Sequence, residues 1–278
     1  MMNKEIKIVF EEKLKKFAES LNSYISTPDG QWTIKGFIDI YRKVYTISSD
    51  TKIISKVLEI HLFPKILEFA NENNYRLEPA QEQNHYPDIS FVSLDGIHKF
   101  ALDLKTTYSD PEYPGFCNGF TLGSHGEYFV DRTSNKNIQY PYKDYSGHYC
   151  LGIIYNRAVA SSVDVTQTYS IDNLGSIHSA IQNLLFFVAE KWRIASDKSG
   201  SGNTANIGSI NKISDILSGN GVFSNLGEKW FDDYWMNYNK IMKPDGSGKI
   251  TNLREFVEYK GGDTSLIVPK PKKTKAHK

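Results

Sequence analysis

Two aspartates and a lysine have the types and spacing of a metal-dependent phosphoryl-transfer site. Tyr86-Pro87-Asp88 is followed farther along the chain by Asp103-Leu104-Lys105. Two neighbouring carboxylates repel each other, and a divalent cation bound through oxygen relieves that repulsion, with Mg²⁺ as the default hard ion. Such an ion stabilises charge on phosphorus and lowers the pKa of its bound water. Lys105 could stabilise the phosphate or, with a lowered pKa, help to deprotonate the water.

A β-hairpin is predicted to bring these side chains together. Asp88 begins a strand over 88–94, and Asp95-Gly96 is typical of a turn that folds the next strand back beside it. Side chains alternate along a strand, so Asp103 and Lys105 share one face while the leucines at 102 and 104 point into the core. A solvated hairpin with an incidental ion pair competes with this interpretation. Pro87 favours the functional one because it fixes the start of the strand.

A third carboxylate, Glu59, lies on a predicted helix that is capped by Ser49 or Asp50 and runs to about Ala70. Pro64 is expected to kink or break this helix. The residues expected to face inward are Ile53, Val57, Ile60 and Leu67. A glutamate on a surface helix is more often merely solvated, so spacing alone does not make Glu59 part of the site.

Apolar periodicity and turn residues predict the other elements. Phe10, Leu14, Phe17, Leu21 and Tyr24 form one apolar stripe on an N-terminal helix. Strands are predicted within 32–47 and over 75–78, 149–155 and 184–188, and helices over 230–238 and 252–260, whereas 110–126 is predicted to be a long surface connection. The aromatic residues of 230–238 are expected in the core rather than stacked on bases.

Composition narrows the class of protein. The 278 residues carry 33 basic and 32 acidic side chains, a balance that neither supports nor excludes an anionic partner. Cys117 and Cys150 are too few for a disulfide framework, and no apolar leader begins the chain, so we expect a cytoplasmic protein. No apolar stretch approaches the roughly 18 residues that a membrane span requires, so we expect no membrane partner. The lysine-rich segment 263–278 is expected to be disordered and solubilising, although it could bind phosphates.

The segment 200–206 is rich in glycine and small polar residues. Its glycines would let the backbone approach base edges, and the amide of Asn203 can pair with two hydrogen-bonding positions on adenine. A disordered connector explains the same composition. A Walker-type phosphate loop is not supported, because no Gly-Lys-Ser/Thr follows. Near the other motif, His85 is expected to shape a loop, and the acid Glu82 would repel phosphate.

Together these motifs resemble the PD-(D/E)xK nuclease family, and within it the type II restriction endonucleases. The resemblance covers roughly residues 45–240 and consists of collinear segments, which are Ser49-Asp50-Thr51-Lys52, the helix of Glu59, Gln83-Asn84-His85-Tyr86-Pro87-Asp88, Asp103-Leu104-Lys105-Thr106-Thr107-Tyr108, Phe120-Thr121-Leu122-Gly123, Lys136-Asn137-Ile138 and Gly200-Ser201-Gly202-Asn203-Thr204. Such a collinear set is far more specific than any one motif.

The resemblance implies a role for each matched residue. Asp88 and Asp103, with Leu104 between the motif's charged residues, would bind Mg²⁺, Lys105 would be the catalytic lysine, and Glu59 an auxiliary catalytic and metal-binding carboxylate. The implied DNA-binding residues are Gly200, Ser201, Gly202, Asn203, Thr204 and Asn206 in a major-groove loop, Gln83 and Asn84 near the minor groove, and Lys52, Thr106, Thr107, Thr121 and Lys136 near the phosphates or in the cleft walls.

The implied fold is an α/β (mixed α+β) restriction-endonuclease-like core, with a mixed five- to six-stranded sheet flanked by helices. Residues 1–262 would form one endonuclease domain, in which about 25–48 and 160–180 make a small dimerisation subdomain. A bacterial homodimer would enclose double-stranded DNA and cut GATATC at its centre to blunt ends with 5′-phosphates, with a cognate DNA methyltransferase as companion activity. The alternatives are a nuclease with another site or a repair or nicking role, and a DNA-binding protein that does not cut. An intact Asp-Asp-Lys set argues against the last.

Overall fold

The computed structural model describes residues 2–82, 84–158, 164–200 and 205–275. The helices are α1 (Met2–Ile25), α2 (Thr51–Glu72), α3 (Glu127–Val130), α4 (Ile213–Ser218), α5 (Glu228–Asn237) and α6 (Leu253–Tyr259). The strands are β1 (Gly36–Ile38), β2 (Lys43–Thr46), β3 (Tyr75–Pro79), β4 (Ile89–Ser93), β5 (Lys99–Tyr108), β6 (Thr121–Ser124), β7 (Gly147–Arg157), β8 (Thr168–Ser170), β9 (Ile181–Glu190), β10 (Ala195–Ser199) and β11 (Asn206–Ser209).

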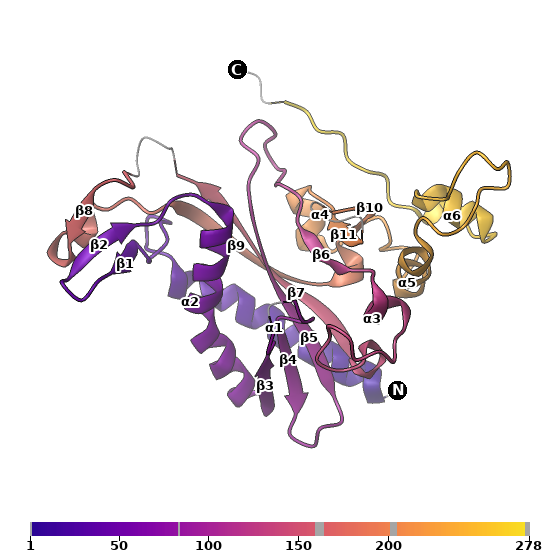
Figure 1. The fold of residues 1–278 in the computed structure, drawn as a ribbon, viewed down its shortest axis with the longest axis horizontal. Coiled ribbons are helices and arrows are strands. Elements are labelled where there is room, and N and C mark those ends of the chain that lie inside the picture. Colours follow the sequence, from indigo (N-terminus) through magenta and orange to yellow (C-terminus); the bar gives the residue numbers. More distant parts are fainter. Residues whose placement is uncertain (1, 83, 159–163, 201–204, 276–278) are drawn as a thin grey trace.

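A five-stranded mixed sheet with the order β3-β4-β5-β7-β9 forms the centre of the fold (Figure 1). The β3–β4–β5 meander and the β7–β9 pair are antiparallel, whereas β5 and β7 run parallel. The predicted hairpin is present, with β4 and β5 joined through the turn at Gly96. This architecture confirms the predicted mixed sheet flanked by helices.

Each face of the central sheet is covered by a separate hydrophobic core. On one face, α1 and α2 pack their apolar side chains against residues such as Phe100 and Leu102. On the other face lie α5, α6 and the three-stranded sheet β10-β11-β6, packed against residues that include Ala101 and Cys150. Because side chains alternate along β5, Asp103 shares the face of Ala101. The polar residues of the hairpin therefore lie on the face opposite α1.

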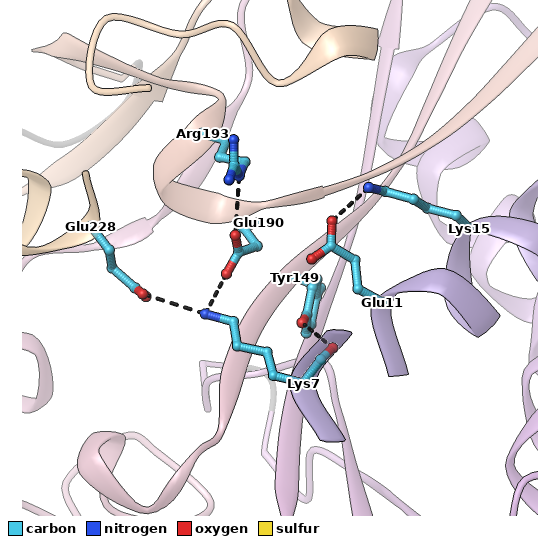
Figure 2. A network of polar contacts seen from close by, with 7 residues as sticks. All are labelled: Lys7, Glu11, Lys15, Tyr149, Glu190, Arg193 and Glu228. Carbon is cyan, nitrogen blue, oxygen red and sulfur yellow. Dashed lines mark hydrogen bonds and ion pairs between the residues drawn. The ribbon is translucent and has the colours of Figure 1, made fainter. Parts of the chain in front are cut away.

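Near its start, α1 is joined to β9 and α5 by ion pairs (Figure 2). The ammonium of Lys7 forms ion pairs with Glu190, at the end of β9, and with Glu228, at the start of α5. Arg193 bonds the same Glu190 carboxylate at 3.1 Å. Lys15, farther along the helix, makes a separate pair with Glu11 at 2.6 Å. The ion pairs of Lys7 thus connect α1, which packs on one face of the central sheet, with α5, which packs on the other face.

The third sheet, which is small and has the order β1-β2-β8, projects at the left of Figure 1. It combines segments from the two ranges predicted to form the dimerisation subdomain, although residues 159–163 lie outside the described part of the chain. Several apolar side chains on it are exposed, among them Phe37, Ile38, Ile40 and Tyr41. Its part in dimerisation stays a prediction.

The prediction of which face of α2 is buried is wrong. Ile53, Ile60 and Leu67 are 41%, 63% and 42% exposed, and only Val57 of the expected set is buried. The buried residues are instead Ile54, Val57, Leu58, Leu62, Ile66, Phe69 and Ala70. Apolar residues occur on most sides of this helix, so the period alone did not identify the packed face. The helix also continues through Pro64 to Glu72, without the expected break.

The expectation of a surface connection over 110–126 is correct only in part. Its second half contains β6, which pairs with β11, and Cys117, Phe120 and Leu122 are buried. Strand β6 is too short to stand out from the surrounding glycines by its composition. In the described part of the lysine-rich segment, residues 268–275 form neither helix nor strand. None of the described helices is long and apolar enough to cross a membrane.

Candidate active site

The hairpin brings Asp88, Asp103 and Lys105 to one point. Asp88 directly precedes β4, and the other two residues lie on one face of β5. The Nζ atom of Lys105 is 3.5 Å from Oδ2 of Asp88 and 3.4 Å from Oδ2 of Asp103. Asp103 is buried and Lys105 half-buried. The structure therefore places the three residues as the sequence predicts, with the ammonium between two carboxylates.

Main-chain hydrogen bonds fix the carboxylates relative to each other. Oδ2 of Asp88 accepts the N–H of Leu104 at 2.7 Å, and the N–H of Asp88 donates to Oδ1 of Asp103 at 3.3 Å. These bonds extend the antiparallel pairing of β4 and β5, in which Ile89 lies opposite Leu102. Both side chains are thus anchored to regular strand rather than to a loop.

One ammonium lies between two carboxylates, and burial together with these charges shifts the pKa values of Asp88 and Lys105. Burial raises the pKa of Asp88, and the repulsion of Asp103 and of Glu59 adds to it, although Lys105 and the Leu104 hydrogen bond act in the opposite direction. For Lys105 burial favours the neutral amine, but the charges of Asp103 and Asp88 outweigh it and raise the pKa above its usual value. Lys105 is therefore a cation here, which favours the charge-stabilising role over that of a base.

The donor set fits a hard cation with few protein ligands. Within the described residues no group of three or more His, Cys, Asp and Glu side chains is arranged to hold a metal ion. Asp88 and Asp103 supply oxygen from two side chains, and their mutual repulsion favours a cation. Mg²⁺ is commonly bound through one or two carboxylates and retains several waters, so a two-carboxylate set suits it.

Two cavities meet at Asp88 and Lys105, each of about 420 Å³. The first, which we call the hairpin cavity, is also lined by Asp103, Asn84 and Lys136. The second, which we call the helix cavity, extends toward α2 and is lined by Glu59, Thr106, Thr107 and Thr121. Most of the residues predicted near the metal and the phosphates therefore surround the same two carboxylates.

Glu59 lies in the wall of the helix cavity and acts on Asp88 through its charge. Its carboxylate forms an ion pair with Lys56 at 2.7 Å. The same charge contributes to the raised pKa of Asp88. This placement brings Glu59 near the cluster, and its auxiliary role stays a prediction.

The predicted DNA-binding residues occupy several settings. Lys136 pairs with Glu127 at 2.6 Å at the hairpin cavity. Lys52 lies in the first turn of α2 and does not line either of the two cavities, although its neighbour Thr51 lines the helix cavity. The hydroxyl of Thr107 donates to the carbonyl of Asn118 at 2.6 Å, so this threonine shapes the wall instead of facing solvent.

The predicted recognition loop is described only at its stem. The N–H of Gly200 donates to the carbonyl of Asn206 at 2.7 Å, which closes the base of the loop. Gly200 also lines a third cavity, of about 510 Å³, which shares the wall 118–120 with the helix cavity. The predicted residues Gln83, Ser201, Gly202, Asn203 and Thr204 lie outside the described residues.

Lys191 is a charged residue near the site that the sequence did not single out. It lies in the turn Lys191–Arg193 and is 3% exposed. Its Nζ lies 4.7 Å from the centre of the Tyr86 ring and has no hydrogen-bond partner among the described residues. Burial lowers its pKa to about 8, against the attraction of Asp103. A lysine beside Trp192 and Arg193 resembles an ordinary surface residue, so the sequence contains no signal for this burial.

Behind the hairpin cavity, aromatic residues hold the Tyr86 side chain in place. Its hydroxyl makes a 2.8 Å hydrogen bond with Nδ1 of His148. The His148 ring stacks on Tyr142 with 3.7 Å between centroids, and Tyr128 stacks on Tyr86 itself. The residue that precedes Pro87 and Asp88 is therefore packed rigidly.

Comparison with known proteins agrees with this geometry. Residues 28–261 match the family model of the restriction endonuclease EcoRV. The type II restriction enzyme EcoRV of Escherichia coli is 35% identical over 235 aligned residues, and the alignment covers 83% of this chain and 93% of that protein. The match includes β4, β5 and the walls of the hairpin and helix cavities, and it confirms the predicted restriction-endonuclease-like fold. The chain therefore belongs to the EcoRV family of type II restriction endonucleases.

Proposed function

We propose that this protein is a Mg²⁺-dependent homodimer that cuts both strands of a palindromic duplex site, GATATC, at its centre. The products would be blunt ends with 5′-phosphates. The observation that carries the proposal is the position of Lys105 Nζ, 3.5 Å and 3.4 Å from the carboxylates of Asp88 and Asp103. The specificity is proposed from the similarity to the type II restriction enzyme EcoRV.

The residues of the hairpin divide the chemistry among them. Asp88 and Asp103, with the main chain at Leu104, would hold Mg²⁺, which would neutralise phosphate charge and lower the pKa of water. The Lys105 ammonium would stabilise charge that develops on the phosphate oxygens, because a fixed cation in a half-buried site is not reorganised during the reaction. Glu59 would adjust the charge of the site from the helix cavity.

Recognition is assigned to the loops beside the cavities. The loop whose stem is closed by Gly200 and Asn206 would enter the major groove, and Asn84 would lie near the minor groove. In a two-fold dimer each subunit reads one half-site and cuts one strand, which explains a palindromic target. The central TA step unstacks easily, so deformation of DNA would contribute to specificity. In the cell, a cognate DNA methyltransferase would protect the host's own sites.

Digestion of a plasmid of known sequence with Mg²⁺, followed by mapping of the ends, tests the proposal. We expect blunt cuts at GATATC with 5′-phosphates, and no cuts by Asp88→Ala. Discrete cuts at another sequence would overturn the specificity and retain the nuclease. Single-strand breaks would indicate a nicking enzyme. DNA binding without any cut would indicate a binding protein that has no catalytic activity.

A further inference from the structure

The lysine-rich C-terminal segment follows the end of the family match and returns toward the active-site side of the fold. The match ends at residue 261, and after Asp263 the chain has no acidic residue. Five lysines lie beyond Pro269, namely Lys270, Lys272, Lys273, Lys275 and Lys278. From α6 the segment runs extended across the molecule toward the loop that follows β5 (Figure 1). We call residues 269–275, which the structure describes, the lysine arm.

Ion pairs and aromatic contacts hold the lysine arm against the protein. Lys270 pairs with Asp197 on β10, and Lys273 pairs with Asp110 at 3.1 Å. Lys275 lies 3.6 Å from Glu112. The ammonium of Lys273 also lies 4.8 Å from the ring centre of Tyr113 and 5.6 Å from that of Phe116. The arm therefore follows a defined path over a surface that contributes three carboxylates.

That path passes the stem of the proposed recognition loop. Lys270 and Lys273 line the cavity of about 510 Å³ whose walls include Lys198 and Gly200. Residues 118–120 form a wall common to this cavity and to the helix cavity, which contains Lys105. The arm and the catalytic cluster thus line two neighbouring cavities that share residues 118–120.

The charges of this surface indicate what the arm does. Without the arm, Asp110 and Glu112 would present uncompensated carboxylates on this surface and would repel a DNA backbone, and the buried Asp197 would lose its cation. The lysines cancel these charges and add an excess of positive charge, since Lys272 is exposed as well. Lys273 and Lys275 are exposed, and exposed ion pairs contribute only about 0–1 kcal/mol each, so these two lysines can exchange their carboxylates for phosphates at small cost. Lys270 pairs instead with the buried Asp197 and anchors the start of the arm.

We propose that the lysine arm is a DNA-backbone-binding element, which neutralises the acidic surface beside the recognition loop and contacts phosphates of the duplex outside the bases that are read. The proposal rests on the proposed function in so far as the ligand is double-stranded DNA. In this proposal the arm increases the affinity for DNA and the salt dependence of binding. It does not contribute to sequence specificity, because phosphate contacts carry no sequence information directly.

The test measures binding of a duplex to the full-length protein without divalent metal, at several salt concentrations between about 50 and 200 mM. The arm variant carries Lys272→Gln, Lys273→Gln and Lys275→Gln, which remove the exposed lysines of the arm and keep the pair of Lys270 with the buried Asp197. A charge-retaining variant carries Arg at the same positions. A distant control carries Lys4→Gln, Lys13→Gln and Lys16→Gln, which remove exposed lysines from α1, on the opposite face of the central sheet. Thermal melting of each variant confirms that it is folded.

Removal of one phosphate contact reduces the slope of log K against log salt by about 0.9. For the arm variant we therefore expect a slope shallower by about 2 to 3 and an affinity about tenfold weaker or more at low salt. The arginine variant and the α1 control should match the wild type. Adding Asp110→Asn and Glu112→Gln to the arm variant should restore part of the affinity.

Three results would overturn the proposal. An unchanged slope and affinity would make the arm a solubilising end, and tighter binding would make it a plug that blocks the surface. Wild-type protein that binds no duplex would exclude both the arm's role and the proposed function. Plasmid digestion tests the proposed function separately. If the protein binds DNA without cutting it, the proposed function fails, but the salt slope still measures the effect of the arm.

Discussion

The carboxylate of Asp88 accepts the main-chain N–H of Leu104 at 2.7 Å. This bond joins the residue before β4 to the strand that carries Asp103 and Lys105. Because the reciprocal N–H of Asp88 donates to Asp103 at 3.3 Å, the two carboxylates are held by the sheet itself. A site fixed in this way is organised before any ligand binds, which favours electrostatic catalysis over induced assembly. Substitution of the charged residues at and around this hairpin should therefore have measurable effects.

Asp103→Ala should abolish cleavage while DNA binding persists. The substitution removes one of the two carboxylates of the proposed metal site, and a contribution of several kcal/mol corresponds to a loss of about 10³-fold or more in the cleavage rate. Single-turnover cleavage and metal-free DNA binding are the two measurements. The matched control is Asp95→Asn, in the exposed turn of the same hairpin, which should cut normally. Comparable cleavage by Asp103→Ala would exclude the proposed site.

Lys105→Met should lower thermal stability without metal and increase the stabilisation by Mg²⁺. The substitution leaves Asp88 and Asp103 facing each other without the ammonium that separates them. We expect a loss of about 2 kcal/mol, somewhat below the 3–5 kcal/mol typical of a fully buried pair. The melting temperature should then rise more on addition of Mg²⁺ than it does for the wild type. This larger rise is expected because Lys105 and Mg²⁺ would compete for the carboxylates of Asp88 and Asp103. Equal metal-induced shifts in both proteins would contradict this competition.

The hairpin and its charged residues were predictable because their signals are local. Alternation along β5 places Asp103 and Lys105 together, the Asp95-Gly96 turn returns the chain, and Pro87 marks the start of the first strand. The pairing of β4 with β5 then follows without knowledge of distant residues. The exact ion-pair geometry and the bond to Leu104 depend on the register, which the turn alone does not specify.

The features that the sequence did not reveal depend on distant contacts. The packed face of α2 is set by the neighbouring sheet and α1, and the helix itself is apolar on too many sides to indicate it. Strand β6 exists because β11, far along the chain, pairs with it. Lys191 is buried because Tyr86, Phe129 and Tyr142 close around it. Nothing next to it in the sequence indicates that environment.

Lys7→Met should destabilise the fold by about 2 kcal/mol, because it leaves the buried carboxylate of Glu190 with only part of its compensation (Figure 2). Chemical denaturation measures the change in the free energy of unfolding. The control is Lys15→Met, also on α1, which breaks a more exposed pair with Glu11 and should cost less than about 1 kcal/mol. Equal losses in the two variants would show that burial does not strengthen the Lys7 contact.

The wild type and Lys191→Met should differ in how their free energy of unfolding depends on pH. Burial lowers the pKa of Lys191 from 10.5 to about 8, so the unfolded chain binds its proton more tightly than the folded one. The stabilisation from the neutral amine is therefore fully present above pH 10.5 and is lost as the pH falls through 8. Relative to the variant, the wild type should gain up to about 3 kcal/mol between these values.

Lys7→Met provides a contrast of opposite sign for that measurement. Burial favours the neutral amine of Lys7, but the charges of Glu228 and Glu190 outweigh it and raise the pKa. The stability that Lys7 contributes should thus be full below pH 10.5 and decline as the pH rises through its folded pKa. Urea denaturation at matched pH values gives both differences, and groups common to the proteins cancel. If the stability difference between wild type and Lys191→Met does not change with pH, the Lys191 ammonium of the wild type is solvated, and its position behind the hairpin cavity does not lower its pKa.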